Sequence, residues 1–199
     1  MQSNSPPLLK TLLIQKLLIS FKKYTMIPEI EKAINEQIAM EAEASFSYLS
    51  MAVWCDYKGL EGTAQFFYRQ SEEEKFHMMK LVEYLLEMDC KPVIPALGNV
   101  VNDYESVQSI FKQTLVQEKT VSQSIHRIIE MATQTNDHAT NNFLQWYVAE
   151  QREEESMIRK IIDKIELIGN GPQSLYYIDK EMDRFNQAII KNIEGEKGK

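Results

Sequence analysis

Cysteine, glycine and proline are scarce in this chain of 199 residues. The two cysteines, Cys55 and Cys90, do not form a CxxC pair, which excludes a disulfide-stapled scaffold, a thiolate zinc site and a rubredoxin-type iron centre. Only 7 glycines and 6 prolines are available to interrupt regular structure. The composition therefore predicts an almost entirely helical protein.

Positive charge is also in deficit, because 22 Lys and Arg face 29 Asp and Glu and leave a net charge of -7. Such a balance repels phosphates, so we expect no nucleic-acid partner, and it suits a protein that handles cations. The hydrophobic share of 44% and the charged share of 26% are ordinary for globular proteins. The length fits one domain on the usual range of about 100 to 200 residues.

Residues 1–25 differ from the rest, since four lysines are their only charged side chains and leucine and isoleucine recur at roughly helical spacing. Lys16 interrupts the apolar run, and no small-residue cleavage site follows, so neither a secretion signal nor a membrane span is predicted. We expect a cytoplasmic protein in which this extension is not part of the fold. Docking of the basic segment on a membrane or an acidic partner remains an alternative.

Four long amphipathic segments follow, over residues 28–57, 61–88 and 106–135 and then from the turn at Asn136-Asp137 to residue 168. Short links make two antiparallel hairpins, while the link of about 17 residues between them is long enough to run the length of a helix. This pattern predicts an all-α four-helix bundle with one long crossover. We expect a domain over residues 26–190 that ends in a short fifth helix at 174–190, and a polar tail at 191–199.

A 4,3 spacing of apolar positions can be followed along each of the four segments. Each apolar seam has one glutamate near its middle, and the four are Glu41, Glu74, Glu118 and Glu154. Counted from the turns at Gly59 and Asn136, these residues lie 15 to 18 positions away. At ~1.5 Å of rise per residue they fall within one helical turn of a common level. The four carboxylates are therefore predicted to converge.

Runs of glutamate usually lie on solvated surfaces, but this alignment favours burial for one or two members of each run. Several unpaired buried carboxylates would cost more than the ~5 to 15 kcal/mol of stability that a domain has. Protons could neutralise them in part, whereas a multivalent cation does so directly. His77, one turn beyond Glu74, favours the cation. Oxygen-rich ligation with one imidazole and no thiolate suits iron or manganese, and the charge suffices for two divalent ions. His126 and His138 have no such neighbours.

At this point residues 26 to about 188 resemble the bacterial non-haem ferritins. The stretches that carry the resemblance are Asn35-Glu-Gln-Ile-Ala-Met-Glu41, Ser45-Phe-Ser-Tyr48, Glu72-Glu-Glu-Lys-Phe-His77, Asn142-Phe-Leu-Gln-Trp-Tyr-Val-Ala-Glu-Gln-Arg-Glu-Glu-Glu155 and Leu175-Tyr-Tyr-Ile-Asp-Lys180. Ferritin-like bundles in general take a Glu from two helices and Glu-x-x-His from the other two. This chain departs from that pattern on its fourth helix, which has Gln151-x-x-Glu154.

The resemblance implies a paired iron site with the ligand positions Glu41, Glu74, His77, Glu118, Gln151 and Glu154. Glu74 would bridge the two irons, Gln151 would lie close to the second, and Tyr48 would lie beside the pair, although spacing alone also allows an ordinary core aromatic there. Glu73, Glu150 and Glu153 match an accessory third-iron site that shares Glu154. Bacterioferritins carry a methionine where this chain has Lys75, so no haem is expected.

The implied function is iron storage and detoxification. A ferroxidase centre would oxidise Fe(II) with dioxygen or hydrogen peroxide, and Fe(III) would be stored as a hydrated oxide inside a homo-oligomeric cage of 24 subunits. Two alternatives stay open at this stage. One is a di-iron oxygenase or peroxidase on the same bundle, which would need an open apolar pocket beside the metals. The other is a non-catalytic helical assembly protein, which would have no reason to bury five acids at one level.

Overall fold

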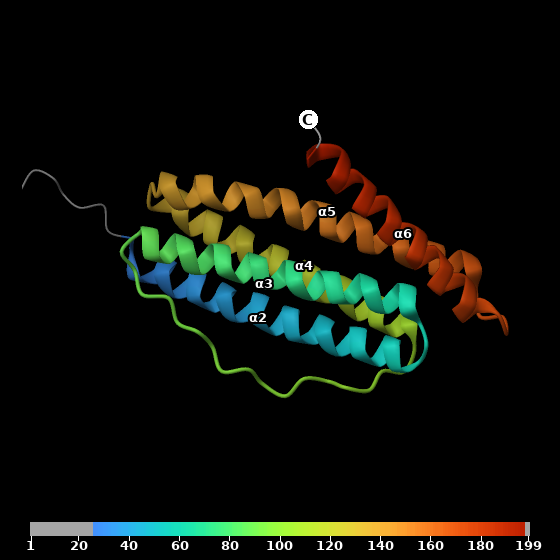
Figure 1. The fold of residues 1–199 in the computed structure, drawn as a ribbon. Coiled ribbons are helices and arrows are strands. Elements are labelled where there is room, and N and C mark those ends of the chain that lie inside the picture. Colours follow the sequence, from blue (N-terminus) through green and yellow to red (C-terminus); the bar gives the residue numbers. More distant parts are fainter. Residues whose placement is uncertain (1–25, 198–199) are drawn as a thin grey trace, which may run out of the picture.

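The computed structural model describes residues 26–197, and these form five helices and contain no strand (Figure 1). The helices are α2 (Pro28–Tyr57), α3 (Glu61–Glu87), α4 (Val107–Gln134), α5 (His138–Ile168) and α6 (Ser174–Lys197). The predicted all-α bundle is confirmed, and its four main helices end within one residue of the expected positions. The basic segment 1–25 lies outside the described residues. In the part that is described, no helix has the length and apolar character that crossing a membrane requires.

Local signals in the sequence account for the helix ends. Pro28 occupies the first turn of α2, where its missing N–H costs no hydrogen bond. The turn after α2 contains Gly59 with a φ of 74°, a conformation that glycine adopts without a steric penalty. Ser106 begins α4 with a reciprocal capping box. The Asp137 carboxylate accepts a hydrogen bond from the first turn of α5.

The crossover between the two hairpins runs alongside α2 from one end of the bundle to the other (Figure 1). Two side chains of α2 hold it in place. The Asn35 Oδ1 atom accepts a hydrogen bond of 2.6 Å from the Val93 N–H, and the Ser50 hydroxyl donates one of 2.6 Å to the Val101 carbonyl. The expected one-crossover connection is therefore the one that the chain adopts.

The apolar core is divided into two clusters along the bundle axis. One cluster contains Ile34, Ile38 and Leu81, and the other contains Phe67 and Phe111. On every bundle helix the seam glutamate lies between residues of the first cluster and residues of the second. The acids thus lie in a polar layer that is closed on both sides by packed apolar side chains.

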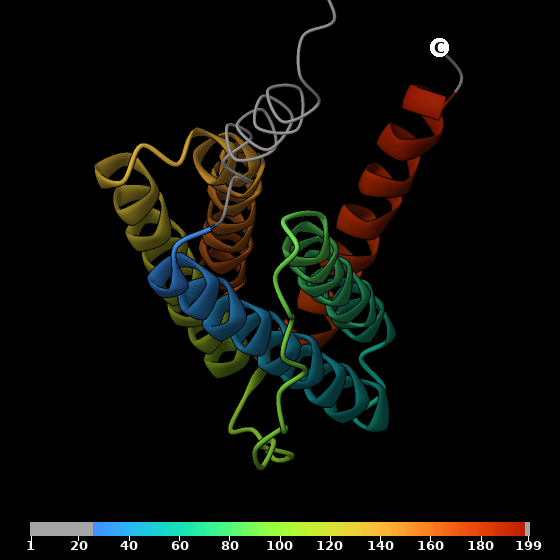
Figure 2. The ribbon, with the colours of Figure 1, turned by 90° about the vertical axis from the view of Figure 1, so that its left-hand side faces the viewer.

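Helix α6 lies outside the four-helix bundle, beside α3 (Figure 2). The Asp179 carboxylate of α6 accepts hydrogen bonds from the backbone N–H and the hydroxyl of Thr63, at 2.8 and 3.0 Å. Gly62 permits this approach, because a Cβ there would lie 2.4 Å from the Asp179 carbonyl oxygen. The helix continues to Lys197, beyond the predicted end at Ile190, because nothing in residues 191–194 ends it and Gly195 is accommodated within it. Most of the expected polar tail is therefore helical.

Candidate metal centre

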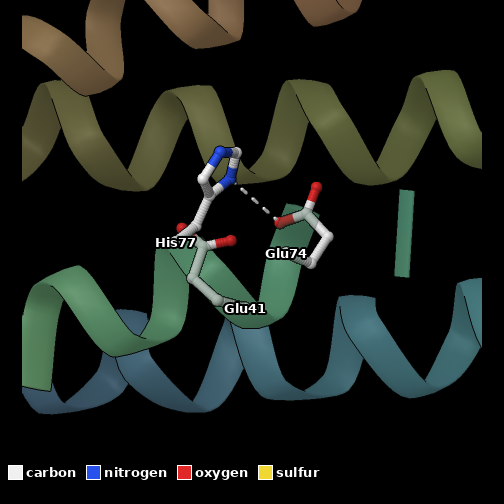
Figure 3. A group of neighbouring side chains, drawn as sticks. All are labelled: Glu41, Glu74 and His77. Carbon is white, nitrogen blue, oxygen red and sulfur yellow. Dashed lines mark ion pairs between the residues drawn. The ribbon is translucent and has the colours of Figure 1, made fainter. Parts of the chain in front are cut away.

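The four seam glutamates are all buried, one on each bundle helix. Their exposed fractions are 0% for Glu41, 2% for Glu74, 1% for Glu118 and 5% for Glu154. Glu41, Glu74 and His77 each offer one ligand atom, and these atoms lie within 4.8 Å of one another (Figure 3). A group of two carboxylates and one imidazole at this spacing can hold a single metal ion. Glu118 and Glu154 are not members of this group.

His77 and Glu74 lie one turn apart on α3, with 3.4 Å between His77 Nδ1 and Glu74 Oε2 (Figure 3). Two aromatic residues of α5 contact His77, one through its ring and one through its backbone. The Trp146 ring packs edge-on to it with 5.4 Å between centroids, and the Tyr147 hydroxyl donates a hydrogen bond of 2.7 Å to the His77 carbonyl. The position of the imidazole is thus set by contacts between helices as well as by its spacing on α3.

Glu118 is the centre of a second set of contacts. The Tyr48 hydroxyl donates a hydrogen bond to Glu118 Oε1, and the Gln151 amide donates one of 3.0 Å to Glu118 Oε2. Tyr48 therefore belongs to the acidic layer as well as to the aromatic core. Gln151 is turned so that its nitrogen, which is not a metal ligand, faces the carboxylate.

Electrostatics favour neutralisation of this layer. Burial raises the pKa of all four seam carboxyls. The Glu74 carboxylate adds to the effect at Glu41, and the Glu118 carboxylate adds to it at Glu74. Burial raises the pKa of Glu118 to about 7, although the hydrogen bond from Tyr48 opposes the shift. A bound cation would offset the repulsion between these buried carboxylates, which contributes to the raised pKa values.

The expected accessory residues line one cavity of about 670 Å³ between α3 and α5. Its wall includes Glu73, Glu150, Glu153 and Glu154, so it adjoins the buried layer. Glu73 and Glu150 each offer an oxygen within 4.8 Å of the other and of a His77 nitrogen. Glu153 is exposed and does not belong to that group. The structure therefore brings two accessory glutamates to the imidazole of the paired site and leaves the third at the rim.

The remaining histidines, His126 and His138, are exposed, as the sequence indicated. Sequence reasoning gave no role to two buried glutamines at the acidic layer, although Gln37 falls on the predicted inward seam of its helix. The Gln37 amide donates to Glu41 at 2.9 Å, and the Gln70 amide donates to Glu154 at 3.1 Å. A signal was available, because each glutamine lies four residues before a seam glutamate of its own helix. The contact of Gln70 with Glu154 on another helix could not be read from that spacing.

Known proteins resemble this chain in sequence and in fold. The sequence profile of the ferritin-like domain matches residues 31–168. The bacterial non-heme ferritin of Escherichia coli O6:H1 is 39% identical over 155 residues, which are 78% of this chain and 94% of that protein. The bacterial non-heme ferritin of Campylobacter jejuni is 38% identical over 165 residues, which are 83% and 94% of the two chains. An open pore ferritin from Archaeoglobus fulgidus has a TM-score of 0.77 and 36% identity, covering 79% of this chain and 96% of that structure. The chain belongs to the ferritin family.

Proposed function

We propose that this chain oxidises Fe(II) at a paired metal site and stores Fe(III) as a hydrated oxide inside a hollow homo-oligomer, in the cytoplasm. The observation that carries the proposal is the buried group of Glu41, Glu74 and His77, which offers three ligand atoms within 4.8 Å in a family whose relatives are named non-heme ferritins. Iron is the substrate in this scheme, and the stored mineral is the product. Iron storage and detoxification follow from the same step.

In this proposal each residue of the acidic layer has a role. Glu41, Glu74 and His77 hold the first iron, and Glu74 bridges to a second that is held by Glu118 and Glu154. Gln151 lies beside that second position through its contact with Glu118, and Tyr48 donates to the same carboxylate. Glu73, Glu150 and Glu153 form the accessory third-iron site in the cavity next to Glu154.

Each of the two Fe(II) ions gives up one electron. With dioxygen as the oxidant, two electrons and two protons make hydrogen peroxide, and with hydrogen peroxide as the oxidant they make two water molecules. Hard carboxylate oxygens favour Fe(III) over Fe(II), which lowers the cost of the oxidation. The accessory glutamates then offer iron a route out of the buried layer and into the cavity.

An apolar surface supports the proposed homo-oligomer, for which the resemblance to ferritins implies 24 subunits. Phe46, Leu49 and Val53 of α2 are exposed, and so are Ile94 and Leu97 of the crossover. Because large apolar side chains gathered on a surface are typical of contacts between proteins, we expect a second copy of the chain to cover this face.

The test is rapid mixing of Fe(II) with air-saturated protein, followed by absorbance. Glu74→Ala and His77→Ala should each remove the fast phase of oxidation, because each takes a ligand from the proposed first iron. Glu83→Ala changes an exposed glutamate of the same helix and should oxidise as the wild type does. A wild-type rate in Glu74→Ala would refute the site.

Particle mass and iron content give a second, independent measurement. A large hollow particle with a ferric core is expected for storage. A small particle that turns over an organic substrate would instead indicate an oxygenase on the same bundle, and a particle without oxidation would indicate an assembly protein.

A further inference from the structure

Two buried glutamines, Gln37 and Gln70, lie beside the acidic layer without belonging to the proposed ligand set. Their exposed fractions are 0% and 2%. Gln37 Nε2 donates to Glu41 Oε1 at 2.9 Å, and Gln70 Nε2 donates from α3 to Glu154 Oε2 on α5 at 3.1 Å. Each amide therefore fixes the orientation of one carboxylate, and the two carboxylates belong to different halves of the proposed iron pair.

Both glutamines leave a buried carbonyl oxygen without a donor. Among the described residues, neither Gln37 Oε1 nor Gln70 Oε1 has a hydrogen-bond partner. A buried acceptor without a donor costs free energy, and a methionine of nearly the same length would avoid that cost. This cost offsets the hydrogen bond that each amide donates to a carboxylate, so the stability of the metal-free bundle gives little reason for a glutamine at either position.

A neutral donor has a specific advantage beside a carboxylate that binds a cation. A lysine or arginine at the same place would pair with the acid and cancel the charge that attracts the metal. Arg69, the residue next to Gln70, donates a hydrogen bond of 2.9 Å from its Nη1 atom to Asn186 Oδ1 on α6, and its charge acts on Glu154 only through a longer-range electrostatic interaction. The amide of Gln70 thus orients Glu154 and leaves its charge available.

We propose that Gln37 positions Glu41 for the first iron and that Gln70 positions Glu154 for the second. This inference rests on the proposed function, in which these carboxylates bind iron. The two effects separate in space, because Glu41 lies in one group with Glu74 and His77. Gln70 and Glu154 line the cavity that holds the accessory glutamates. Loss of Gln70 therefore also disturbs the passage of iron into that cavity.

The experiment is an anaerobic titration of the full-length metal-free protein with Co(II), followed by visible absorption and calorimetry. Co(II) reports ligand geometry and avoids oxidation during the measurement. The variants are Gln37→Met and Gln70→Met, with Gln65→Met as the control, because Gln65 is an exposed glutamine of α3. His77→Ala identifies which of the two Co(II) affinities belongs to the first position.

We expect Gln37→Met to weaken the His77-dependent position by about 10- to 100-fold, and Gln70→Met to weaken the other position by a similar factor. The melting temperature of either metal-free variant should stay close to that of the wild type, since the cost of the unpartnered carbonyl and the benefit of the donated hydrogen bond are removed together. Gln65→Met should match the wild type in both measurements.

Three results would overturn the inference. The first is wild-type Co(II) affinity in both methionine variants. The second is equal weakening of both positions by each variant, and the third is a fall in metal-free melting temperature in step with the affinity, which would make the glutamines merely structural. If the wild type showed no His77-dependent Co(II) position, the proposed function itself would fall and this inference with it.

Discussion

Replacement of Glu118 by glutamine should change how the stability of the metal-free protein depends on pH. Burial raises the pKa of Glu118 from an ordinary 4.5 to about 7. The folded protein therefore holds this proton more tightly than the unfolded chain does. As the pH rises through the interval from 4.5 to about 7, the free energy of unfolding of the wild type should fall, because the folded state must bury a carboxylate.

The size of the effect follows from the shift. A pKa that moves from 4.5 to about 7 corresponds to about 3 kcal/mol at ~1.4 kcal/mol per unit. Glutamine keeps the shape of the protonated acid, and its carbonyl oxygen can accept the hydrogen bond from the Tyr48 hydroxyl. The Gln151 amide can turn so that its oxygen accepts a hydrogen bond from the new amide. The Glu118→Gln variant should approach the stability of the wild type as the pH falls below 4.5, where the carboxyl is protonated in both the folded and the unfolded state. Above pH 7 it should be more stable by about 3 kcal/mol, or ~6 to 12 °C in melting temperature.

The measurement is a series of thermal melts of chelator-treated protein by circular dichroism between about pH 4 and pH 8, a range that spans the titration of this carboxyl in the unfolded and the folded state. Glu130→Gln, an exposed change on the same helix, is the control and should follow the wild-type curve. Anaerobic Fe(II) should narrow the difference at high pH, since a bound cation neutralises the wild-type carboxylate. A constant offset at every pH, or lower stability of Glu118→Gln at high pH, would refute the reasoning.

Three further outcomes are expected. Glu150→Ala should slow later turnover, or change the iron taken up per subunit, more than it slows the first fast phase of oxidation; loss of that first phase would place Glu150 in the paired site. Gly62→Ala should weaken the packing of α6, because the new Cβ would lie 2.4 Å from the Asp179 carbonyl oxygen. The free energy of unfolding should fall by about 1 to 3 kcal/mol, and unchanged resistance of α6 to limited proteolysis would contradict this. A shortened chain that starts at Met26 should assemble and oxidise Fe(II) as the full chain does, and particle mass and oxidation rate measure this. If the shortened chain instead lost only its binding to anionic liposomes, the removed segment would be a membrane anchor.

Much of the fold could be predicted because its determinants are local. Helix ends depend on residues within one turn, such as Pro28, Gly59 and Ser106, and these can be read directly from the chain. The seams depend on apolar periodicity, which fixes the inward face of each helix. The burial of Glu41 and Glu118 follows from the same two facts, since residues on inward faces at one level of a bundle must meet.

The end of α6 was a different case. The residues after Ile190 carry only weak helix-ending signals, so the sequence did not specify where α6 ends. The packing of Gly62 against the Asp179 backbone depends on the angle at which α3 and α6 cross. Periodicity identifies the face that a helix buries. It does not specify the neighbouring backbone or its distance.

The sequence by itself thus determined the bundle, its crossover and the level at which acids and His77 gather. Only the tertiary structure decided which side chain supports which acid: Gln70 reaches Glu154 across two helices, and the Glu73 and Glu150 carboxylates approach His77 while Glu153 stays at the rim. The physical reason is one of range. Local spacing along a helix determines which face of the helix a side chain lies on. A hydrogen bond or a ligand contact requires two atoms within a few ångströms of each other. That precision comes from side-chain rotamers and helix crossing angles, which residues far apart in the sequence fix together.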